Sequence, residues 1–258
     1  MQPVCYELDG HVAVITLNRP EAMNTFNPDM YRAFNEATER FKNDDNAWVA
    51  LITAAGEKAF SAGVDIKALD AFLADKELEE AAKYLDILIE GEYYTDKPMI
   101  AAIQGYCVGE GLSMALGCDI RICSENASFC LPESKIGVPT VNAAIHATKL
   151  MGSSHALELL LLGEHRDAEW AIQRGLVNKV VPTADLYETA LDWAKKIASL
   201  SPLANRATKE VTLKSHALSF EQATQLGAVR RKVVMGSKDA AEGRRAFIEK
   251  RPPNFICG

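Results

Sequence analysis

The feature that most constrains this chain is a short apolar run followed at once by a cluster of glycines. The run MIAAIQG, residues 99–105, is bounded by Pro98 and is too short for a typical helix, so it predicts a buried strand. Glycines follow at positions 105, 109, 111 and 117, and Glu110 stands between two of them. Glycine has no Cβ and tolerates positive φ, so glycines this dense favour a loop whose backbone comes close to another group. The stretch therefore predicts a strand, a tight loop and a helix that opens near Leu112.

The same order of strand, glycine loop and helix recurs along the chain, which predicts an α/β core. WVALITA, residues 48–54, has the composition of a buried strand, and the loop after it carries glycines at 56 and 63. Further strands are predicted at 11–18, 119–125, 127–133 and 176–182, and helices at 29–42, 76–94, 153–163 and 167–175. From Asp185 onward the pattern is wholly helical. We therefore expect a core over residues 1–182 and a helical region over residues 183–258.

Composition and charge exclude several classes of protein. The 258-residue chain has a net charge of -7, whereas a nucleic-acid-binding protein normally carries a basic face. The six cysteines form no C-x-x-C pair and lie mostly in apolar stretches, so we interpret them as reduced and structural. The N-terminus lacks the features of a signal peptide, and no apolar run approaches the roughly 20 residues that span a bilayer. These observations predict a cytoplasmic protein with no membrane or nucleic-acid partner; a matrix protein without its transit peptide would look the same.

Two glycine loops, SAGVD and VGEGL, each follow a buried strand and each lead into a predicted helix. Backbone N–H groups at a helix N-terminus lack partners within the helix and favour negative charge. Two such groups from separate loops would form an oxyanion hole. Tight turns between strand and helix explain each loop equally well when it is considered alone.

Other enzyme motifs are missing from the sequence. GEGLSM is not a phosphate-binding P-loop, and Met114 breaks the pattern of a dinucleotide-binding loop. No G-x-S-x-G is present for an esterase nucleophile. The five histidines show no metal-ligand spacing, so we expect no metal site.

Several segments resemble the enoyl-CoA hydratase/isomerase (crotonase) family, in the same order and from about residue 4 to residue 255. They are LNRPEAMN, AFSAGVDIKAL, KPMIAAIQGYCVGEGLSMALGCDIRI, ASFCLPESKIGVP, GLVNKVVP and AFIEKRPPNF. The resemblance implies a crotonase-like spiral of repeated ββα units with a helical C-terminal region that assembles trimers or hexamers. It also implies an enolate formed from an acyl-CoA thioester and held by the N–H groups of Val64 and Glu110. Coenzyme A is then part of the substrate, and no other cofactor is expected.

The resemblance also implies residues that contact coenzyme A. They are Ala22, Met23, Ala62, Asp65, Ile66, Lys67 and Lys250. The resemblance implies that Lys67 binds a phosphate group of coenzyme A. It also implies that Lys250 reaches the CoA bound to a neighbouring subunit. For each lysine alone, a solvated surface amine is an equally good interpretation.

The chain departs from the hydratase pattern at several positions. Hydratases in the family use two glutamates; Glu133 matches the second, whereas Ser113 stands at the place of the first. A serine hydroxyl cannot act as a base unaided. Glu110 stands where hydratases have glycine, and its side chain either supplies the missing carboxylate or, by default, points to solvent. The loop IGVPTVNAAI is about one residue shorter than its family counterpart, so Asn142 and His146 line the site differently, although His146 is also a good candidate for a packed helical residue.

Three functional interpretations follow. The leading one is single-base isomerisation of an enoyl-CoA double bond, in which Glu133 moves a proton between two carbons. The alternative is a divergent hydratase that recruits Glu110, with decarboxylation or hydrolysis of an acyl-CoA open within the same family. The third is an inactive acyl-CoA-binding protein, and the retained Glu133 argues against it.

Overall fold

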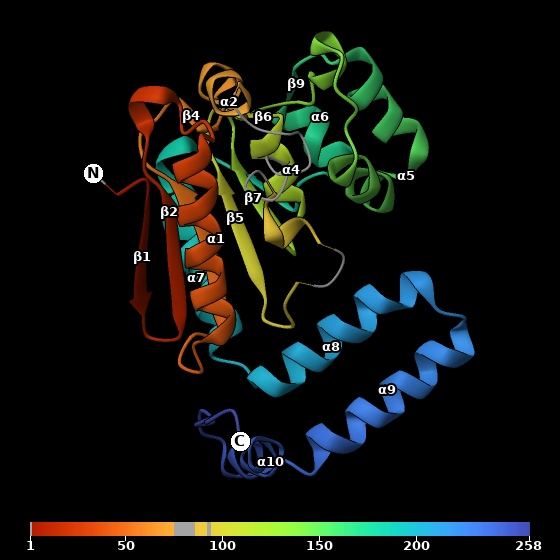
Figure 1. The fold of residues 1–258 in the computed structure, drawn as a ribbon. Coiled ribbons are helices and arrows are strands. Elements are labelled where there is room, and N and C mark those ends of the chain that lie inside the picture. Colours follow the sequence, from red (N-terminus) through yellow and green to blue (C-terminus); the bar gives the residue numbers. More distant parts are fainter. Residues whose placement is uncertain (1, 75–85, 92–93) are drawn as a thin grey trace.

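A six-stranded sheet forms the centre of the computed structural model, which describes residues 2–74, 86–91 and 94–258 (Figure 1). The strand order is β1-β2-β3-β5-β7-β10, with β1 and β2 antiparallel and all other neighbours parallel. The strands are β1 (Val4–Asp9), β2 (Val12–Leu17), β3 (Val49–Ala54), β5 (Met99–Ile103), β7 (Ile120–Ser124) and β10 (Lys179–Val181). The predicted α/β class is confirmed.

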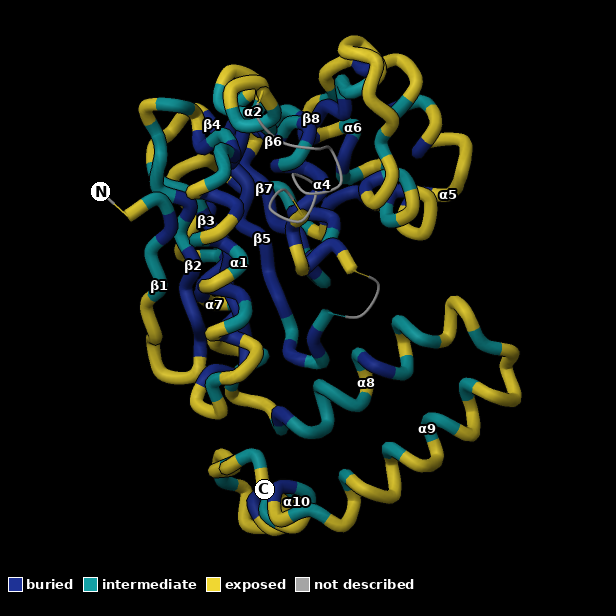
Figure 2. Tube along the Cα trace, in the orientation of Figure 1, coloured by how far each residue is buried: buried dark blue, intermediate teal, exposed yellow. Residues whose placement is uncertain are grey.

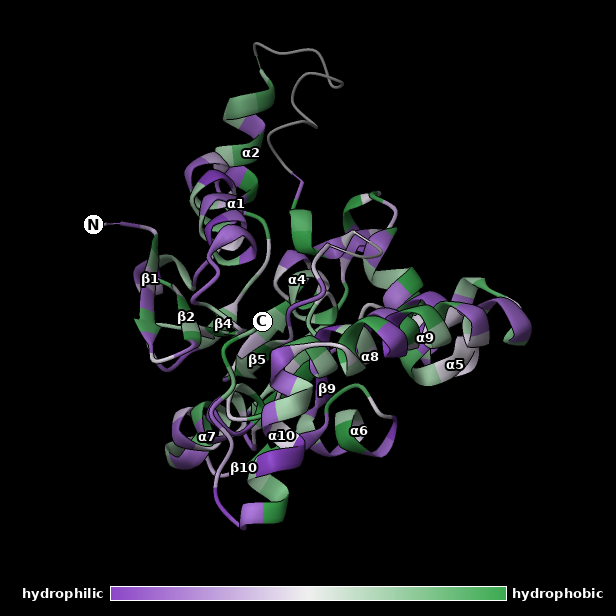
Figure 3. Ribbon diagram, turned by 90° about the horizontal axis from the view of Figure 1, so that it is seen from below, coloured by the Kyte–Doolittle hydropathy of each residue, from purple (hydrophilic) through white to green (hydrophobic). Residues whose placement is uncertain are grey.

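Both faces of this sheet are buried, because its side chains alternate between two apolar cores. In β2, Ile15 packs in the cluster with α1 (Pro28–Asn43), whereas Val14 packs in the cluster with α7 (Leu186–Ala198). Figure 3 shows α1 and α7 on opposite sides of the strands. The near-continuous apolar sequence of these strands follows from this double burial.

A second, smaller sheet gives the fold its repeat. Its order is β4-β6-β8-β9, with β4 over Ala59–Ser61, β6 over Tyr106–Val108, β8 over Ser128–Cys130 and β9 over Arg166–Asp167. Three successive units each give one strand to each sheet and then enter a helix or helical turn. The units end in α2 (Ile66–Leu73), α4 (Glu110–Leu116) and the 3-10 turn η3 (Glu133–Ile136). This repetition confirms the predicted crotonase-like spiral of ββα units.

Some predicted helices differ from the observed ones. Helix α4 begins at Glu110, two residues before the predicted start. The helix predicted at 153–163 is the second part of α5 (Asn142–Leu162), which bends at Gly152, where φ is 74°. The helix predicted at 76–94 falls largely outside the described residues, and its described part contains the 3-10 turn η2 (Leu88–Glu90). α6 (Ala168–Gln173) matches its prediction.

Three C-terminal helices form an arm that projects from the core (Figure 1). They are α8 (Pro202–Lys214), α9 (Phe220–Met235) and α10 (Lys238–Glu249), and we call them the C-terminal arm. α9 has no buried residue, and its surface is half-buried or exposed along its length (Figure 2). Phe220 and Phe247 are 89% and 87% exposed. The helical character predicted after Asp185 is confirmed, and the division at residue 182 stays a prediction.

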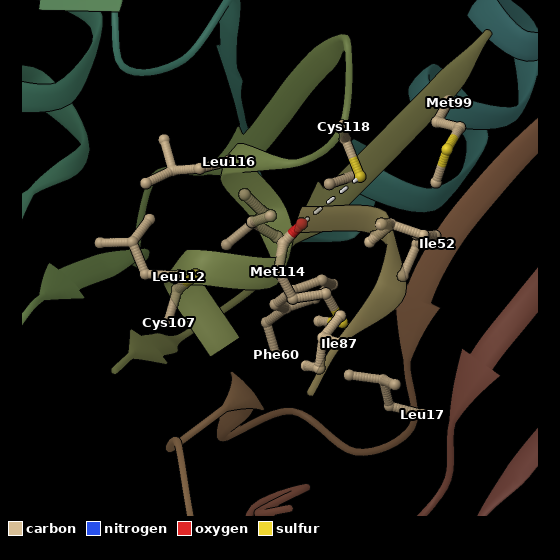
Figure 4. Close-up of a cluster of buried hydrophobic side chains, with 14 of the residues drawn as sticks. Leu17, Ile52, Phe60, Ile87, Met99, Cys107, Leu112, Met114, Leu116 and Cys118 are labelled. Atoms are coloured by element: carbon tan, nitrogen blue, oxygen red, sulfur yellow. Dashed lines mark hydrogen bonds between the residues drawn. The ribbon is translucent and has the colours of Figure 1, made fainter. Parts of the chain in front are cut away.

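A dense cluster of apolar side chains packs around α4, the helix that follows the glycine-rich loop. Leu112, Met114 and Leu116 of α4 pack with buried side chains from the neighbouring strands, including Phe60 and Ile52 (Figure 4). Side chains in such a close-packed core have little freedom to shift. The backbone at the start of α4 is therefore held in place. Four of the six cysteines are buried in this part of the molecule, as predicted, and all six are free thiols.

Candidate active site

The two glycine loops lie against each other. Gly63, before α2, has φ +95°, and Gly109, before α4, has φ +54°. A Cβ built on Gly63 would lie 3.0 Å from the carbonyl oxygen of Val108 and 3.7 Å from the backbone nitrogen of Glu110. Both glycines therefore satisfy a positive φ and a close backbone approach at the same time.

In each loop, the N–H group predicted to bind an oxyanion has no acceptor in the described part of the chain. Phe26 holds the first loop, because its N–H donates to Gly63 at 2.8 Å and its carbonyl accepts from Asp65 at 2.8 Å. The N–H of Val64, between these two bonds, has no acceptor there. The N–H of Glu110 is the first of α4 and likewise has none, as expected at a helix N-terminus. The two N–H groups predicted to form an oxyanion hole are therefore both free, on loops that touch.

Glu133 lies next to these loops at the start of η3. Its Oε2 accepts a hydrogen bond from the Thr140 hydroxyl at 3.0 Å. A Cβ built on Gly109 would lie 3.4 Å from Glu133 Oε1, so this carboxylate lies directly against the second glycine loop. The predicted catalytic glutamate and the predicted N–H donors thus form one constellation.

The side chain of Glu110 turns inward, so the default interpretation of it as a solvent-facing group is wrong. Burial raises the pKa of its carboxyl to about 8, and the negative charges of Glu90 and Glu133 act in the same direction. A hydrogen bond from Tyr31, itself only 2% exposed, partly opposes the rise. Tyr31 belongs to α1, so a side chain from another element holds the Glu110 carboxyl.

Glu90 is a third carboxylate of this site that the sequence did not reveal. It lies in η2 and is 6% exposed. Burial raises its pKa to about 7, with a contribution from the charge of Glu133, while hydrogen bonds from Ser113 and Asn142 oppose the rise. The Asn142 amide donates to Oε2 at 3.1 Å. Ser113 stands where the family has its first glutamate. It therefore faces the carboxylate of Glu90, which belongs to η2.

Glu90 is also held through its backbone. Nε2 of His146 donates to the carbonyl oxygen of Glu90 over 2.9 Å, since a carbonyl can only accept. The prediction that Asn142 and His146 line the site is consistent with these contacts to Glu90. The buried residues Ile87 and Ile89 precede Glu90 and alternate with less buried positions. This alternation was the sequence signal for a non-helical segment, but these residues lie within the stretch that was predicted as a helix.

The raised pKa of Glu90 predicts a pH-dependent effect on stability. A carboxyl whose folded-state pKa exceeds its unfolded value adds stability that is complete below about pH 4.5 and is lost as pH rises through about 7. Glu90→Gln does not titrate, so we expect the free energy of unfolding of the variant to gain on the wild type between pH 5 and pH 9, by up to about 3 kcal/mol. Denaturant titrations at both pH values measure this gain.

The control for this prediction is Glu57→Gln, which changes an exposed carboxylate outside the site. Its difference from the wild type should stay the same at both pH values. A Glu90→Gln difference that is equally independent of pH would contradict the assignment of a raised pKa to Glu90.

Comparison with known proteins identifies the family. The family model described as "Enoyl-CoA hydratase/isomerase" matches residues 7–256. The chain belongs to the enoyl-CoA hydratase/isomerase family. It is 38% identical to an (E)-benzylidenesuccinyl-CoA hydratase of Thauera aromatica, over 98% of both chains. It is 36% identical to a carnitinyl-CoA dehydratase of Salmonella typhi, over 95% of both.

Solved structures agree with this assignment. The chain superposes on an enoyl-CoA hydratase of Bacillus anthracis with a TM-score of 0.91 and 31% identity, over the whole length of both chains. The resemblance inferred from sequence motifs is thus confirmed at its predicted extent. The chain is therefore an enzyme of the hydratase/isomerase family, whose members act on acyl-CoA thioesters.

In a member of this family the residues predicted to contact coenzyme A should share one surface, and six of the seven do. Residues 22–23 lie at the end of the 3-10 turn Pro20–Ala22, and residues 62–67 form the adjoining loop and the first residues of α2. The Ala62 N–H donates to the Met23 carbonyl at 3.0 Å, and Arg19 pairs with Asp65 at 3.3 Å. Ile66 and Lys67 are exposed beside them. Arg19 was not predicted, although it directly precedes the first loop.

Lys250 is the one predicted CoA contact that does not lie on this surface of the same chain. It caps the C-terminal end of α10, on the arm, at the opposite end of the molecule from α2 (Figure 1). A contact between Lys250 and the CoA of a neighbouring subunit stays a prediction. Within the described residues, no three His, Cys, Asp or Glu side chains are grouped so as to hold a metal ion, and no helix is long and apolar enough to span a bilayer.

Proposed function

We propose that this member of the family catalyses the reversible addition of water to a 2-enoyl-CoA. The observation that carries the proposal is the inward, partly buried side chain of Glu110, whose carboxyl shares the site with Glu133. Water addition needs a base for the water and an acid for the α-carbon. Both named relatives are enzymes of hydration or dehydration, which supports the same reaction.

Each group has a step in the proposed reaction. The N–H groups of Val64 and Glu110 bind the thioester oxygen and stabilise its negative charge. Glu133 takes a proton from water as the oxygen bonds to the β-carbon, and the double-bond electrons move to the thioester oxygen. Glu110, protonated because its pKa is raised to about 8, then gives its proton to the α-carbon as the enolate collapses. A proton then passes from Glu133 to Glu110 through solvent and restores both groups, so the net change is the addition of one water molecule.

Ser113 favours the second candidate, single-base isomerisation. With no glutamate at this position, Glu133 alone can remove a proton from one carbon of a 3-enoyl-CoA and return it to another. Hydration becomes the leading reaction because the inward Glu110 supplies the second carboxylate that isomerisation does not need. A binding role without catalysis would leave this acid without a use.

Binding and assembly complete the proposal. The surface formed by residues 22–23 and 62–67 is proposed to hold coenzyme A, with exposed Lys67 near its phosphates. Exposed apolar side chains on the C-terminal arm, such as Phe220 and Phe247, support assembly into a homotrimer or homohexamer. No cofactor beyond the CoA of the substrate is proposed, and cytoplasmic localisation stays a prediction.

Two substrates separate the two candidate reactions. The purified protein is incubated with crotonyl-CoA and with 3-hexenoyl-CoA, and the absorbance of the conjugated enoyl thioester is followed. Hydration removes this absorbance from crotonyl-CoA, whereas isomerisation creates it from 3-hexenoyl-CoA. We expect loss with the first substrate; gain with the second and no change with the first would replace hydration by isomerisation.

A further inference from the structure

A compact turn brings Thr140 back to the proposed base, Glu133. Glu133 begins η3, and Gly137, with φ +75°, follows the end of this turn and reverses the chain. The Val138 N–H then donates to the Glu133 carbonyl oxygen at 3.1 Å. The turn therefore closes on the backbone of Glu133, and Thr140, seven residues after Glu133, reaches the side chain of the same residue.

The segment that carries Thr140 has little conformational freedom. Residue 139 is a proline, which fixes its own φ and disfavours helical conformations of Val138 before it. The side chain of Thr140 is branched at Cβ, so few rotamers are open to it. Its hydroxyl does not cap the next helix, because α5 begins at Asn142 without a side-chain cap. Among the described residues, the Glu133 carboxylate is the one hydrogen-bond acceptor of this hydroxyl.

The two oxygens of the Glu133 carboxylate have different surroundings. Oε2 accepts from the Thr140 hydroxyl at 3.0 Å. Oε1 lies against the second glycine loop, 3.4 Å from the position of a Cβ built on Gly109. No other group in the described part of the chain donates a hydrogen bond to this carboxylate. Oε1 is therefore the oxygen left for a reacting molecule, next to the loop that carries the N–H of Glu110.

A single hydrogen bond matters here because the terminal torsion of a glutamate side chain is broad. Without a second contact, the carboxylate plane of Glu133 would sample many orientations. Proton transfer requires the accepting oxygen within hydrogen-bond reach of the proton, in a productive alignment. The bond from Thr140 to Oε2 restricts this torsion and keeps Oε1 beside Gly109.

We propose that Thr140 is a positioning residue, whose hydroxyl holds Oε2 of Glu133 so that Oε1 is presented to the reacting water molecule. This inference rests on the proposed function for the role of Glu133 as the base. Thr140 itself does not touch the substrate in this proposal, and it acts only through the orientation of the Glu133 carboxylate.

Thr140→Val and Thr140→Ser separate the hydroxyl from the shape of the side chain. Valine has nearly the same shape without a donor, whereas serine keeps the hydroxyl and loses only a methyl group. We expect Thr140→Val to lower kcat for crotonyl-CoA by about 10-fold or more, and to leave the Kd for butanoyl-CoA within about 3-fold of the wild type. Thr140→Ser should keep kcat within about 3-fold of the wild type.

Thr224→Val is the matched control. Thr224 is an exposed threonine of α9 whose hydroxyl donates to the Phe220 carbonyl at 2.8 Å, outside the site. This variant should keep the wild-type kcat. Melting temperatures measured for all variants show that a slow variant is folded.

The Glu133→Gln background distinguishes positioning from a structural role of the loop. If Thr140 acts only through the carboxylate, adding Thr140→Val should change the residual single-turnover rate of Glu133→Gln by less than about 3-fold. A structural role would lower the rate by the same factor in both backgrounds, which would overturn the inference. Equal losses of kcat in Thr140→Val and Thr140→Ser would overturn it as well.

The same variants are measured with 3-hexenoyl-CoA, because Glu133 is the base in both candidate reactions. Isomerisation in place of hydration, slowed by Thr140→Val and not by Thr140→Ser, would refute only the proposed function. Hydration of crotonyl-CoA that is equally fast in the wild type and in Thr140→Val would refute only this inference.

Discussion

Replacing Glu133 by glutamine is expected to lower kcat by at least about 10³-fold, because general acid–base groups contribute on this scale. Glutamine has nearly the same size and can still accept the hydrogen bond that the Thr140 hydroxyl gives to Glu133. The substitution removes only the ability to take a proton. The Kd for a saturated acyl-CoA and the melting temperature should therefore change little.

Glu125→Gln is the matched control for this variant. Glu125 is an exposed glutamate just after β7 and lies outside the site. Its kcat should equal that of the wild type. A Glu133→Gln enzyme that keeps more than a tenth of the wild-type kcat would mean that another group is the base.

Replacing Gly63 by alanine is expected to lower kcat by about 10²-fold or more, the scale for losing one oxyanion-hole donor. The new Cβ would lie 3.0 Å from the Val108 carbonyl oxygen, and the backbone φ of +95° is strained for alanine. The loops that carry Val64 and Glu110 must then move apart. Because the thioester oxygen needs both N–H groups, a small displacement should have a large effect on the rate.

Gly10→Ala is the control that separates the effect of moving the two loops from the effect of backbone strain alone. Gly10 has φ +59° but no atom within 4 Å of the added Cβ, and it lies between β1 and β2. Both variants should lose stability from backbone strain, and Gly63→Ala should lose more because its Cβ also meets the Val108 carbonyl, whereas only Gly63→Ala should lose kcat. Measurement of melting temperature beside kcat shows whether a slow variant is folded. A folded Gly63→Ala enzyme with wild-type kcat would refute the proposed donors.

The fold was largely readable from local patterns. Double burial makes the parallel strands continuously apolar, as in MIAAIQG, and positive φ at Gly63 and Gly109 requires glycine. The two N–H donors and Glu133 were assigned by the resemblance of the motifs to the family. The motifs that carry them lie in order along the chain, so the family could be predicted before any contact was known.

The side chains that decide the reaction could not be predicted in the same way. Glu110 points inward because Tyr31, far away in sequence, meets it from α1. Glu90 lies in the 3-10 turn η2, where a helix was predicted. It is held in the site by hydrogen bonds from Asn142 and His146 of α5. Each of these contacts joins segments about 50 residues or more apart. Local periodicity contains no information about such pairings.

The measurement that tests the central claim most directly is the rate of crotonyl-CoA hydration by the wild type and by Glu110→Gln. Glutamine keeps the backbone N–H at position 110 and removes only the acid. If Glu110 is the second carboxylate, the wild type hydrates crotonyl-CoA, and the variant loses about 10²-fold or more of that rate while its Kd for a saturated acyl-CoA stays within about 3-fold. Hydration by Glu110→Gln at the wild-type rate would contradict this account.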